Sequence, residues 1–398
     1  MSEKTKTAAV ASSVTAVIMV CFFILFLQYT GAFSQSTEEK ALAEKLMNIQ
    51  AIIDKNSIYE FDVTTAENNA AYGYLHGIND DKYFMYYSQD EYESYISTVN
   101  GDGSGVGIIM SYNSSGLLSD GIFIRRVVGG SPAEEAGIKA GDKIVNLNGQ
   151  DLTGMRYADV SDSLIVNAGD VMQFGIIRNE EYLNFEVTAS LYSEREVDYY
   201  KTSDGYGYIR IYRFATNASE QFRAALEDLC AQGVTGLILD VRGNGGGELE
   251  TVCKMVDMLV SEGDIIIMKT KSGEDIRSST PDKLIDVPYV VLVNHETASA
   301  AEMFSSSLRD LVGAPLIGEK TYGKAVGQTF FGLQDGSAVK ITTFQYFTQN
   351  RVDFNGIGLE PDDVIEFDAE KTKRLYCLRE EEDLQLLRAV EHLKSKIG

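Results

Sequence analysis

A serine and a lysine whose local sequences suit acyl transfer lie twenty-five residues apart in this chain. Ser299 lies where an apolar strand pattern, Pro288 to Val293, gives way to a helical pattern, and Lys324 lies between small residues on a turn. A serine hydroxyl is a poor nucleophile until a neighbouring base takes its proton. A lysine can be that base when it is neutral near the working pH. The pair therefore predicts nucleophilic catalysis by Ser299 with Lys324 as the base.

The surroundings of Lys324 favour a neutral amine. Burial away from water disfavours the ammonium form and lowers the pKa of a lysine. The small and apolar neighbours Gly323, Ala325 and Val326 suit such a water-poor pocket. The alternative is that Lys324 is a solvated turn lysine and that Ser299 only caps a helix.

A Ser-His-Asp triad is the rival arrangement, because His295 lies four residues before Ser299. The chain has three histidines, and the other two are His76 and His392. If Ser299 opens a helix, His295 precedes it in a loop and does not share its face. No nearby aspartate is evident to hold the imidazole in the tautomer that a triad requires. The Ser-Lys pair is therefore the preferred interpretation.

Acyl transfer also needs backbone amides that point at the developing negative charge. The amide of Ala300, next to the candidate nucleophile, is the first such donor. A second lies in the segment Gly236 to Gly247, where a buried strand pattern runs into a glycine-rich turn and then a helix. This segment is not a dinucleotide fingerprint, because Glu248 stands where the third glycine should be, and it lacks the lysine of a phosphate loop. A plain strand-to-helix turn is the alternative.

Two motifs in this region resemble those of the carboxyl-terminal processing peptidases, which are serine proteases with a Ser-Lys dyad. They are Val-Asn-His-Glu-Thr-Ala-Ser-Ala-Ala-Glu, ending at Glu302, and Gly-Glu-Lys-Thr-Tyr-Gly-Lys-Ala-Val-Gly-Gln, ending at Gln328. The resemblance runs from about Ala70 to about Phe367. It implies that Gln328, four residues after the lysine, helps to orient Lys324.

The resemblance also implies roles for the glycine-rich turn. In the family this loop supplies an oxyanion amide, which falls here on Gly245 or Gly246. Asp240 and Arg242 are expected to brace the loop rather than to act in catalysis.

The chain departs from the family's pattern in two places. Glu296-Thr297 replaces the usual Gly-Ser before Ala-Ser-Ala, and this change could alter the subsite next to Ser299. Gln349 stands where relatives commonly have proline, and this change affects the detail of the loop after Thr348 but not the dyad.

A second domain is expected between about Ser104 and about Ser190. Its clearest run, Gly129 to Gly149, reads as a short helix opened by Pro132, a glycine stop, a turn and a strand. This run resembles a PDZ domain. PDZ domains add a peptide as an extra strand and hold its C-terminal carboxylate on backbone amides. The glycines of the expected clamp permit close backbone approach, which plain core, the alternative, would not need. The expected clamp consists of Gly105, Val106, Gly107 and Ile108.

Length and composition limit the other functions. The chain has 398 residues, long enough for two or three domains, and its hydrophobic fraction of 44% is ordinary for folded protein. A net charge of −24 argues against nucleic acid or anionic lipid as a partner. No cysteine pair has metal-ligand spacing and no cysteine lies beside a histidine. We therefore expect no metal, no cofactor and no thiol nucleophile.

The first thirty-odd residues predict a membrane anchor. The run from Ala8 to Leu27 has no charge and is rich in Val, Ile, Phe and Leu, long enough for one helix to cross a bilayer. Lys4 and Lys6 precede it, which predicts a single-pass protein of the cell membrane with a cytoplasmic N-terminus and the catalytic part outside. A cleaved signal peptide, with small residues near Gly31-Ala32, is the alternative.

Two helical patterns follow, from about Thr37 to about Tyr59 and from about Thr65 to about His76. In relatives such an N-terminal arm pairs two subunits, so the resemblance implies a homodimer, and packing on the chain's own core is the alternative. A last helical pattern, from about Glu380 to about Lys396, is expected to pack back or to help assembly. The apolar residues on one face of the first pattern are Leu42, Leu46, Ile49 and Ile53.

Together these patterns predict an α/β multidomain fold with an N-terminal transmembrane helix, a helical arm, a PDZ-like β-rich domain and an α/β peptidase core with a mixed sheet. The predicted activity is that of a serine endopeptidase that cuts polypeptides with free C-termini at or near those ends. A catalytically idle PDZ scaffold and a signalling protease switched by a partner are the alternatives. The expected parts are a cytoplasmic stub (1–7), a transmembrane anchor (8–30), a helical arm with the start of the peptidase body (31–103), a PDZ-like domain (104–190) and a peptidase core with a C-terminal helix (191–398).

Overall fold

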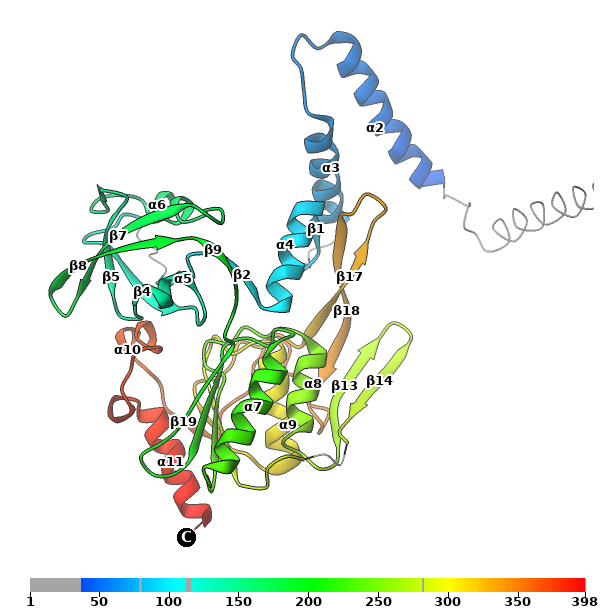
Figure 1. The fold of residues 1–398 in the computed structure, drawn as a ribbon. Coiled ribbons are helices and arrows are strands. Elements are labelled where there is room, and N and C mark those ends of the chain that lie inside the picture. Colours follow the sequence, from blue (N-terminus) through cyan, green and yellow to red (C-terminus); the bar gives the residue numbers. More distant parts are fainter. Residues whose placement is uncertain (1–36, 79–80, 112–115, 281–282, 398) are drawn as a thin grey trace, which may run out of the picture. The chain divides into compact units, whose positions relative to one another are not determined.

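The computed structural model describes residues 37–78, 81–111, 116–280 and 283–397, and the chain divides into two compact units, residues 1–69 and 70–398. The first unit holds helix α2 (Thr37–Asn56) and the start of helix α3 (Val63–Ile78), which confirms the two predicted helical patterns (Figure 1). A homodimer through this arm stays a prediction. The apolar residues that repeat along α2 are 37% to 46% exposed, namely Leu42, Leu46, Ile49 and Ile53.

The prediction of a transmembrane helix in this fold is wrong for the part of the chain that the structure describes. Within residues 37–78, 81–111, 116–280 and 283–397, no helix combines the length and the apolar character needed to cross a bilayer. Helix α2 has 20 residues, but its many acidic and basic side chains would have to enter the hydrocarbon. The predicted anchor itself, residues 8–30, lies outside the described residues. The expected cell-membrane location depended on that segment and stays a prediction.

A mixed six-stranded sheet forms the centre of the second unit, in the order β10-β11-β12-β15-β16-β19. β10 is antiparallel to β11, whereas the other neighbours are parallel. Every residue of β15 is apolar and buried, as expected for a strand with helices on both faces of its sheet. The strands are β10 (Val197–Lys201), β11 (Gly207–Ile211), β12 (Leu237–Asp240), β15 (Tyr289–Val293), β16 (Leu316–Gly318) and β19 (Asp363–Val364).

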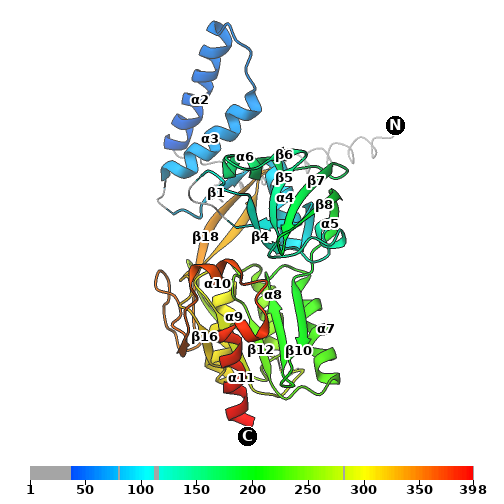
Figure 2. The ribbon, with the colours of Figure 1, turned by 90° about the vertical axis from the view of Figure 1, so that its left-hand side faces the viewer.

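Helices cover both faces of this sheet. Alternate strand side chains face opposite ways, so Leu237 and Leu239 join the core under α7, α8 and α9, whereas Ile238 joins the core under α11. Figure 2 shows α7 and α11 on opposite sides of the strands. The C-terminal helix therefore packs back on the sheet, one of the two expected outcomes. The covering helices are α7 (Ala218–Ala231), α8 (Leu249–Asp257), α9 (Ala300–Val312) and α11 (Leu384–Ile397), and the short helix α10 (Ala369–Lys373) and the 3-10 helix η1 (Glu380–Glu382) precede α11.

The loops that carry the candidate site leave from one edge of the sheet. β12 and β15 are parallel neighbours, so their carboxyl ends lie side by side. The glycine-rich turn follows β12, and Ser299 follows β15 at the start of α9, which confirms the predicted strand-to-helix junction. In open α/β sheets, ligands bind at this edge.

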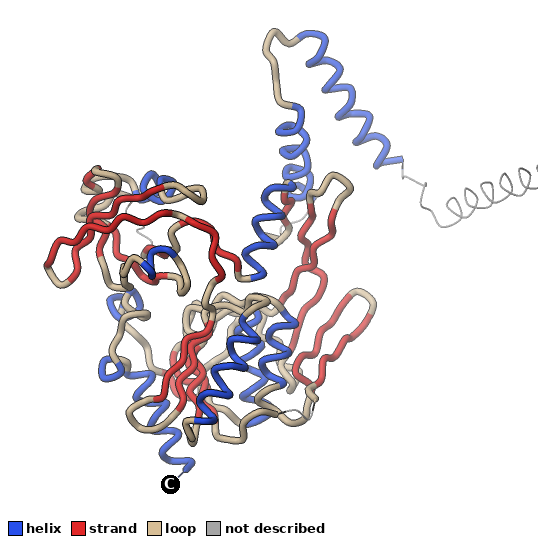
Figure 3. Tube along the Cα trace, in the orientation of Figure 1, coloured by secondary structure: helices blue, strands red, loops and turns tan. Residues whose placement is uncertain are grey.

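The segment that follows Lys324 belongs to an antiparallel five-stranded sheet. In this sheet β18 pairs with β1, β13 and β17, and Lys324 lies two residues before the start of β17. Helix α4 (Gln89–Asn100) places Tyr95 against Phe330 of β17, with ring centroids 4.5 Å apart. Figure 3 shows β17 and β18 as a long hairpin. The strands are β1 (Met85–Tyr87), β13 (Asp264–Thr270), β14 (Gly273–Ser278), β17 (Val326–Gly332) and β18 (Ala338–Phe347).

A separate antiparallel sheet in the order β3-β4-β5-β7-β8, with β6 paired to β5, surrounds its own hydrophobic core. Pro132 opens the short helix α5 and the strand β5 follows, which confirms the predicted local pattern. Its elements are β3 (Ile108–Met110), β4 (Ile122–Val127), α5 (Pro132–Glu135), β5 (Lys143–Leu147), β6 (Gln150–Asp151), α6 (Tyr157–Ser163), β7 (Val171–Arg178) and β8 (Glu181–Thr188). The flanking strands β2 (Asp102–Gly105) and β9 (Ser190–Ser193) pair with each other in a two-stranded sheet.

Candidate active site

Ser299 occupies the turn between β15 and α9 in an uncommon backbone conformation. Its φ is +57° and its ψ is −123°, values that non-glycine residues rarely adopt. Such strain persists only where surrounding contacts hold it. The side-chain oxygen of Asn294 accepts a hydrogen bond from the Gly243 amide at 2.9 Å, and the Ala298 amide donates to the Asn244 carbonyl at 3.0 Å. These bonds tie the loop of Ser299 to the glycine-rich turn.

A buried glutamate joins Ser299 to the segment of Lys324. Glu302, in the first turn of α9, is 0% exposed, and one of its carboxylate oxygens accepts the backbone N–H groups of Ser299 at 2.9 Å and Lys324 at 2.8 Å. The other oxygen accepts the Gly323 N–H at 2.7 Å and the Thr321 hydroxyl at 2.6 Å. Burial raises the pKa of Glu302, and these donors act against the rise.

The sequence reasoning missed Glu302 as a functional residue, although a signal was present. The spacing Ser-x-x-Glu from Ser299 is that of a capping box, in which the glutamate accepts the amide of the residue that caps the helix. The signal could not reveal the donors from Thr321, Gly323 and Lys324, because they belong to a later segment.

Ser299 and Lys324 line one cavity of about 510 Å³, here called the catalytic cavity. Lys324 Nζ lies 4.5 Å from the ring centroid of Tyr83, and the two catalytic candidates share the cavity without a hydrogen bond between their side chains in the described structure. The Tyr346 hydroxyl donates to the Lys324 carbonyl and also contacts the Ser299 side chain. Burial lowers the pKa of Lys324, and two nearby lysine charges lower it further.

Gln328 also lines the catalytic cavity. Its side-chain amide donates to the Thr342 hydroxyl at 3.2 Å, because the two residues face each other across β17 and β18. The structure therefore places Gln328 beside the site, and its orienting effect on Lys324 stays a prediction.

The glycine-rich turn lies close to Ser299 and to the first turn of α9. A Cβ added to Gly246 would lie 2.9 Å from the Ser299 Cβ and 3.1 Å from the Ala300 nitrogen. The φ of Gly246 is +111°. The Gly246 amide already donates to the Asn244 side chain at 2.8 Å. Gly245 and Ala300 line the catalytic cavity, whereas Gly246 is not among the residues that line it. The oxyanion role of these amides stays a prediction.

Asp240 and Arg242 form part of a buried charge network beneath this turn. The Arg242 guanidinium contacts Asp240 at 2.6 Å and Asp383 at 2.7 Å, and Arg210 contacts Asp240 at 2.6 Å. Burial acts to raise the pKa of Asp240, but the two guanidinium groups outweigh it and hold the pKa below its usual value. Asp240 is the last residue of β12, and none of these four residues is among those that line the catalytic cavity.

His295 lies apart from Ser299. Its side chain is 56% exposed, and its Nδ1 contacts Glu319 at 2.7 Å. His295 lines a different cavity, which Glu296 also lines. This placement removes the support for a Ser-His-Asp triad.

Comparison with known proteins identifies the family. The model of peptidase family S41 matches residues 205–365, and the PDZ domain model matches residues 96–177. A carboxyl-terminal-processing protease of Picosynechococcus sp. is 30% identical over 311 residues, which cover 76% of this chain and 74% of that protein. The chain belongs to peptidase family S41, a family with carboxyl-terminal-processing proteases among its members.

Two further comparisons extend this assignment. The chloroplastic C-terminal processing peptidase of Tetradesmus obliquus is 34% identical over 280 residues, which cover 66% of this S41 chain and 60% of that protein. The chain thus spans less than two thirds of that relative's length. The solved structure of the photosystem II D1 C-terminal processing protease superposes with a TM-score of 0.52 at 28% identity, covering 83% of this chain and 90% of that one.

One departure of this S41 chain from the family pattern makes a contact with the PDZ sheet. Arg125 of β4 donates to both carboxylate oxygens of Glu296, one of them at 2.7 Å, and its guanidinium lies 5.4 Å from the Tyr376 ring centroid. Burial acts to raise the pKa of Glu296, but the Arg125 charge lowers it overall. The loop before Ser299 is therefore bound to the PDZ sheet by an ion pair.

The second departure, Gln349, ties its loop to the peptidase core. Its side-chain amide donates to the Ile265 carbonyl and to the Ser307 hydroxyl, the latter at 3.0 Å. A proline at this position could make neither bond.

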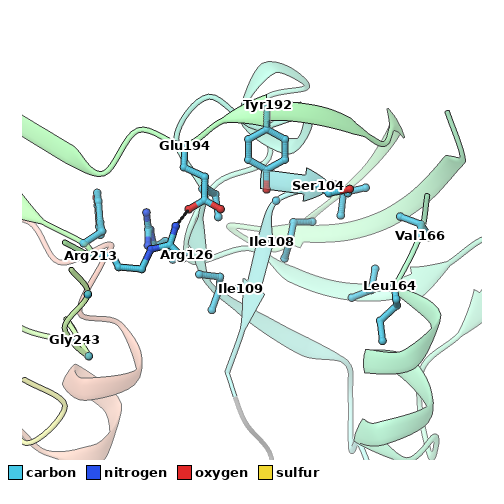
Figure 4. A pocket seen from close by; sticks show the side chains of 18 of the residues that line it. Ser104, Ile108, Ile109, Arg126, Leu164, Val166, Tyr192, Glu194, Arg213 and Gly243 are labelled. Atoms are coloured by element: carbon cyan, nitrogen blue, oxygen red, sulfur yellow. Dashed lines mark hydrogen bonds and ion pairs between the residues drawn. The ribbon is translucent and has the colours of Figure 1, made fainter. Parts of the chain in front are cut away.

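The predicted clamp of the PDZ domain opens into a second cavity of about 840 Å³, here called the tail cavity. Gly105 and Gly107 have φ values of +104° and +81°, which a residue with a side chain rarely adopts. Figure 4 shows Ser104, Ile108 and Tyr192 on one side of this cavity and Arg126, Arg213 and Gly243 on the other. The predicted clamp residues Gly105, Val106, Gly107 and Ile108 all line it.

Arg126 supplies a cation to the tail cavity that the sequence reasoning missed. Its guanidinium stacks on the Tyr212 ring at 3.6 Å from the centroid, and its Nε and Nη2 atoms have no hydrogen-bond partner among the described residues. Its neighbour Arg213 is paired with Glu194 at 2.9 Å (Figure 4). Arg213 and Gly245 line both cavities, so the tail cavity adjoins the catalytic cavity.

Proposed function

We propose that this chain is a serine endopeptidase that cuts polypeptides at or near a free C-terminus, with Ser299 as nucleophile and Lys324 as general base. The strongest support is the position of Glu302. Its buried carboxylate accepts the backbone N–H groups of Ser299 and Lys324, which line one cavity. A pair joined in this way has its spacing set before substrate arrives, as efficient catalysis requires.

The mechanism uses groups that already lie at the cavity. Ser299 Oγ attacks the carbonyl carbon of the scissile bond as Lys324 Nζ takes the hydroxyl proton. The carbonyl oxygen becomes an oxyanion, which the Ala300 and Gly245 amides stabilise. Lys324 then gives its proton to the leaving amine. Water, deprotonated by Lys324, hydrolyses the acyl group from Ser299 and restores the enzyme.

The tail cavity supports recognition of the substrate's end. Backbone amides near Gly107 and the Arg126 guanidinium, whose Nε and Nη2 have no hydrogen-bond partner among the described residues, offer donors to a terminal carboxylate. Arg213 and Gly245 belong to both cavities, so a polypeptide bound by its end has a path toward Ser299.

Replacement of the two catalytic candidates tests this proposal. Ser299→Ala and Lys324→Ala should each abolish hydrolysis of an unfolded protein while the circular dichroism spectrum stays unchanged. Because the residues act as a unit, the double variant should lose little more than either single variant. His295→Ala is the matched control and should keep most of the activity. A catalytically idle scaffold would show no Ser299-dependent hydrolysis, and near-normal turnover by Lys324→Ala would refute the dyad.

A further inference from the structure

A second lysine stands on the wall of the catalytic cavity. Lys340 of β18 lines the same cavity as Ser299 and Lys324. Its ammonium donates a hydrogen bond to the Tyr87 hydroxyl at 2.9 Å. Nζ also lies 5.3 Å from the ring centroid of Tyr87, 5.9 Å from that of Tyr95 and 5.8 Å from that of Phe330.

The three aromatic rings hold the Lys340 ammonium in place without neutralising its charge. Tyr87, Tyr95 and Phe330 come from β1, α4 and β17, so three separate elements form one cage around the ammonium. An aromatic face attracts a cation and is itself neutral. A carboxylate partner would neutralise the charge, whereas this cage leaves the field of Lys340 to act on the cavity.

We propose that Lys340 is a positioning residue for the hydrolysis described above, and that its caged positive charge keeps the neighbouring Lys324 in the neutral form that can accept the Ser299 proton. The inference rests on the proposed function, because it concerns the same base. The physical cause is repulsion between like charges, which disfavours a second ammonium nearby.

The other groups that face Lys324 set the size of this effect. After burial, Lys340 makes the largest contribution to the lowered pKa of Lys324, followed by Lys82 from the segment before β1. Asp81 from the same segment and Glu302 from α9 act in the opposite direction. The Tyr83 ring lies under the ammonium and Tyr346 of β18 binds the backbone carbonyl of Lys324, and both are uncharged contacts. The charged groups Arg213 and Glu248 line the same cavity.

The experiment compares the full chain with Lys340→Met, which removes the charge, and Lys340→Arg, which keeps it. The pH dependence is measured for kcat/KM of peptide hydrolysis and for the rate at which a fluorophosphonate labels Ser299. Removal of the charge raises the pKa of Lys324, so both profiles of Lys340→Met should move to higher pH. We expect a shift of about half to one pH unit, a roughly threefold to tenfold loss on the acidic limb that high pH restores. Lys340→Arg and the surface control Lys394→Met should keep the wild-type profile.

The possible results separate this inference from the proposed function. Unshifted profiles in Lys340→Met would overturn the inference, and so would a raised KM or a uniform loss at every pH, which indicate substrate binding or a structural role. Failure of wild type to label at Ser299 at any pH would refute the proposed function instead. If Lys340→Met does not fold, Lys82→Met decides. Lys82 is exposed and contacts Tyr322 and Tyr83, and removal of its charge should shift the profiles in the same direction by a smaller amount.

Discussion

The catalytic cavity and the tail cavity adjoin each other but are built in different ways. At the catalytic cavity, Glu302 accepts four hydrogen bonds, and every one comes from the protein itself. At the tail cavity, two guanidinium nitrogens of Arg126 have no hydrogen-bond partner in the part of the chain that the structure describes. A site that must hold reacting atoms gains from internal bonds that exist before binding. A site that must recognise an end gains from donors that only the ligand satisfies. The polar groups at the catalytic cavity are therefore satisfied within the protein, whereas those of Arg126 at the tail cavity are satisfied only in part.

The largest expected effect concerns the buried charges beneath the glycine-rich turn beside the catalytic cavity. Arg242→Met should lower the free energy of unfolding by about 3–5 kcal/mol, because it leaves Asp240 and Asp383 as buried charges with fewer partners. Urea unfolding followed by circular dichroism measures the change. Arg156→Met is the matched control, since it breaks only the exposed pair with Asp159 and should leave stability almost unchanged. Equal stability of the two variants would show that the catalytic side does not depend on its buried charges.

Glu302→Gln should have the next largest effect, on turnover rather than on folding. The amide keeps the shape of the side chain, but its NH2 group would face N–H donors where the carboxylate oxygen accepts them. We expect kcat to fall roughly a hundredfold or more as Ser299 and Lys324 lose their common anchor. Steady-state kinetics on a fluorogenic peptide measures the loss. A near-normal kcat would mean that the spacing of the dyad is held by other contacts.

The smallest expected effect concerns the tail cavity. A peptide with a free C-terminal carboxylate should be cut about tenfold more efficiently than its amide, because a hydrogen bond to a charged group is worth about 1.5–3 kcal/mol. Arg126→Gln should reduce this preference and leave the unfolding free energy nearly unchanged. Arg223→Gln, on the exposed side of α7, is the matched control and should keep the preference. Equal cleavage of acid and amide by wild type would remove the role in tail recognition.

The sequence predicted the features that depend on neighbouring residues. The junction at Ser299, the short helix at Pro132 and the helix in the N-terminal arm follow from local patterns of apolar, glycine and proline residues.

The interactions that the sequence did not reveal join distant segments. Glu302 meets donors near Lys324, Arg242 meets Asp383, and Lys340 meets rings from three elements. These contacts depend on the order of strands in the sheets, which no local pattern specifies. The prediction of a transmembrane helix rested on the hydropathy of a segment that lies outside the described residues. The helices that the structure describes are too short or too charged to cross a bilayer.

The link between Arg242 and Asp383 also has a consequence in time. Asp383 comes 141 residues after Arg242 in the chain. At a synthesis rate of about 5–20 residues per second, the ribosome needs roughly 7–28 seconds to make that stretch. During this interval the glycine-rich turn exists in the nascent chain without one of the carboxylates that brace it. The contact between Arg242 and Asp383 can form only after Asp383 has left the ribosome. The candidate active site is therefore completed only near the end of synthesis.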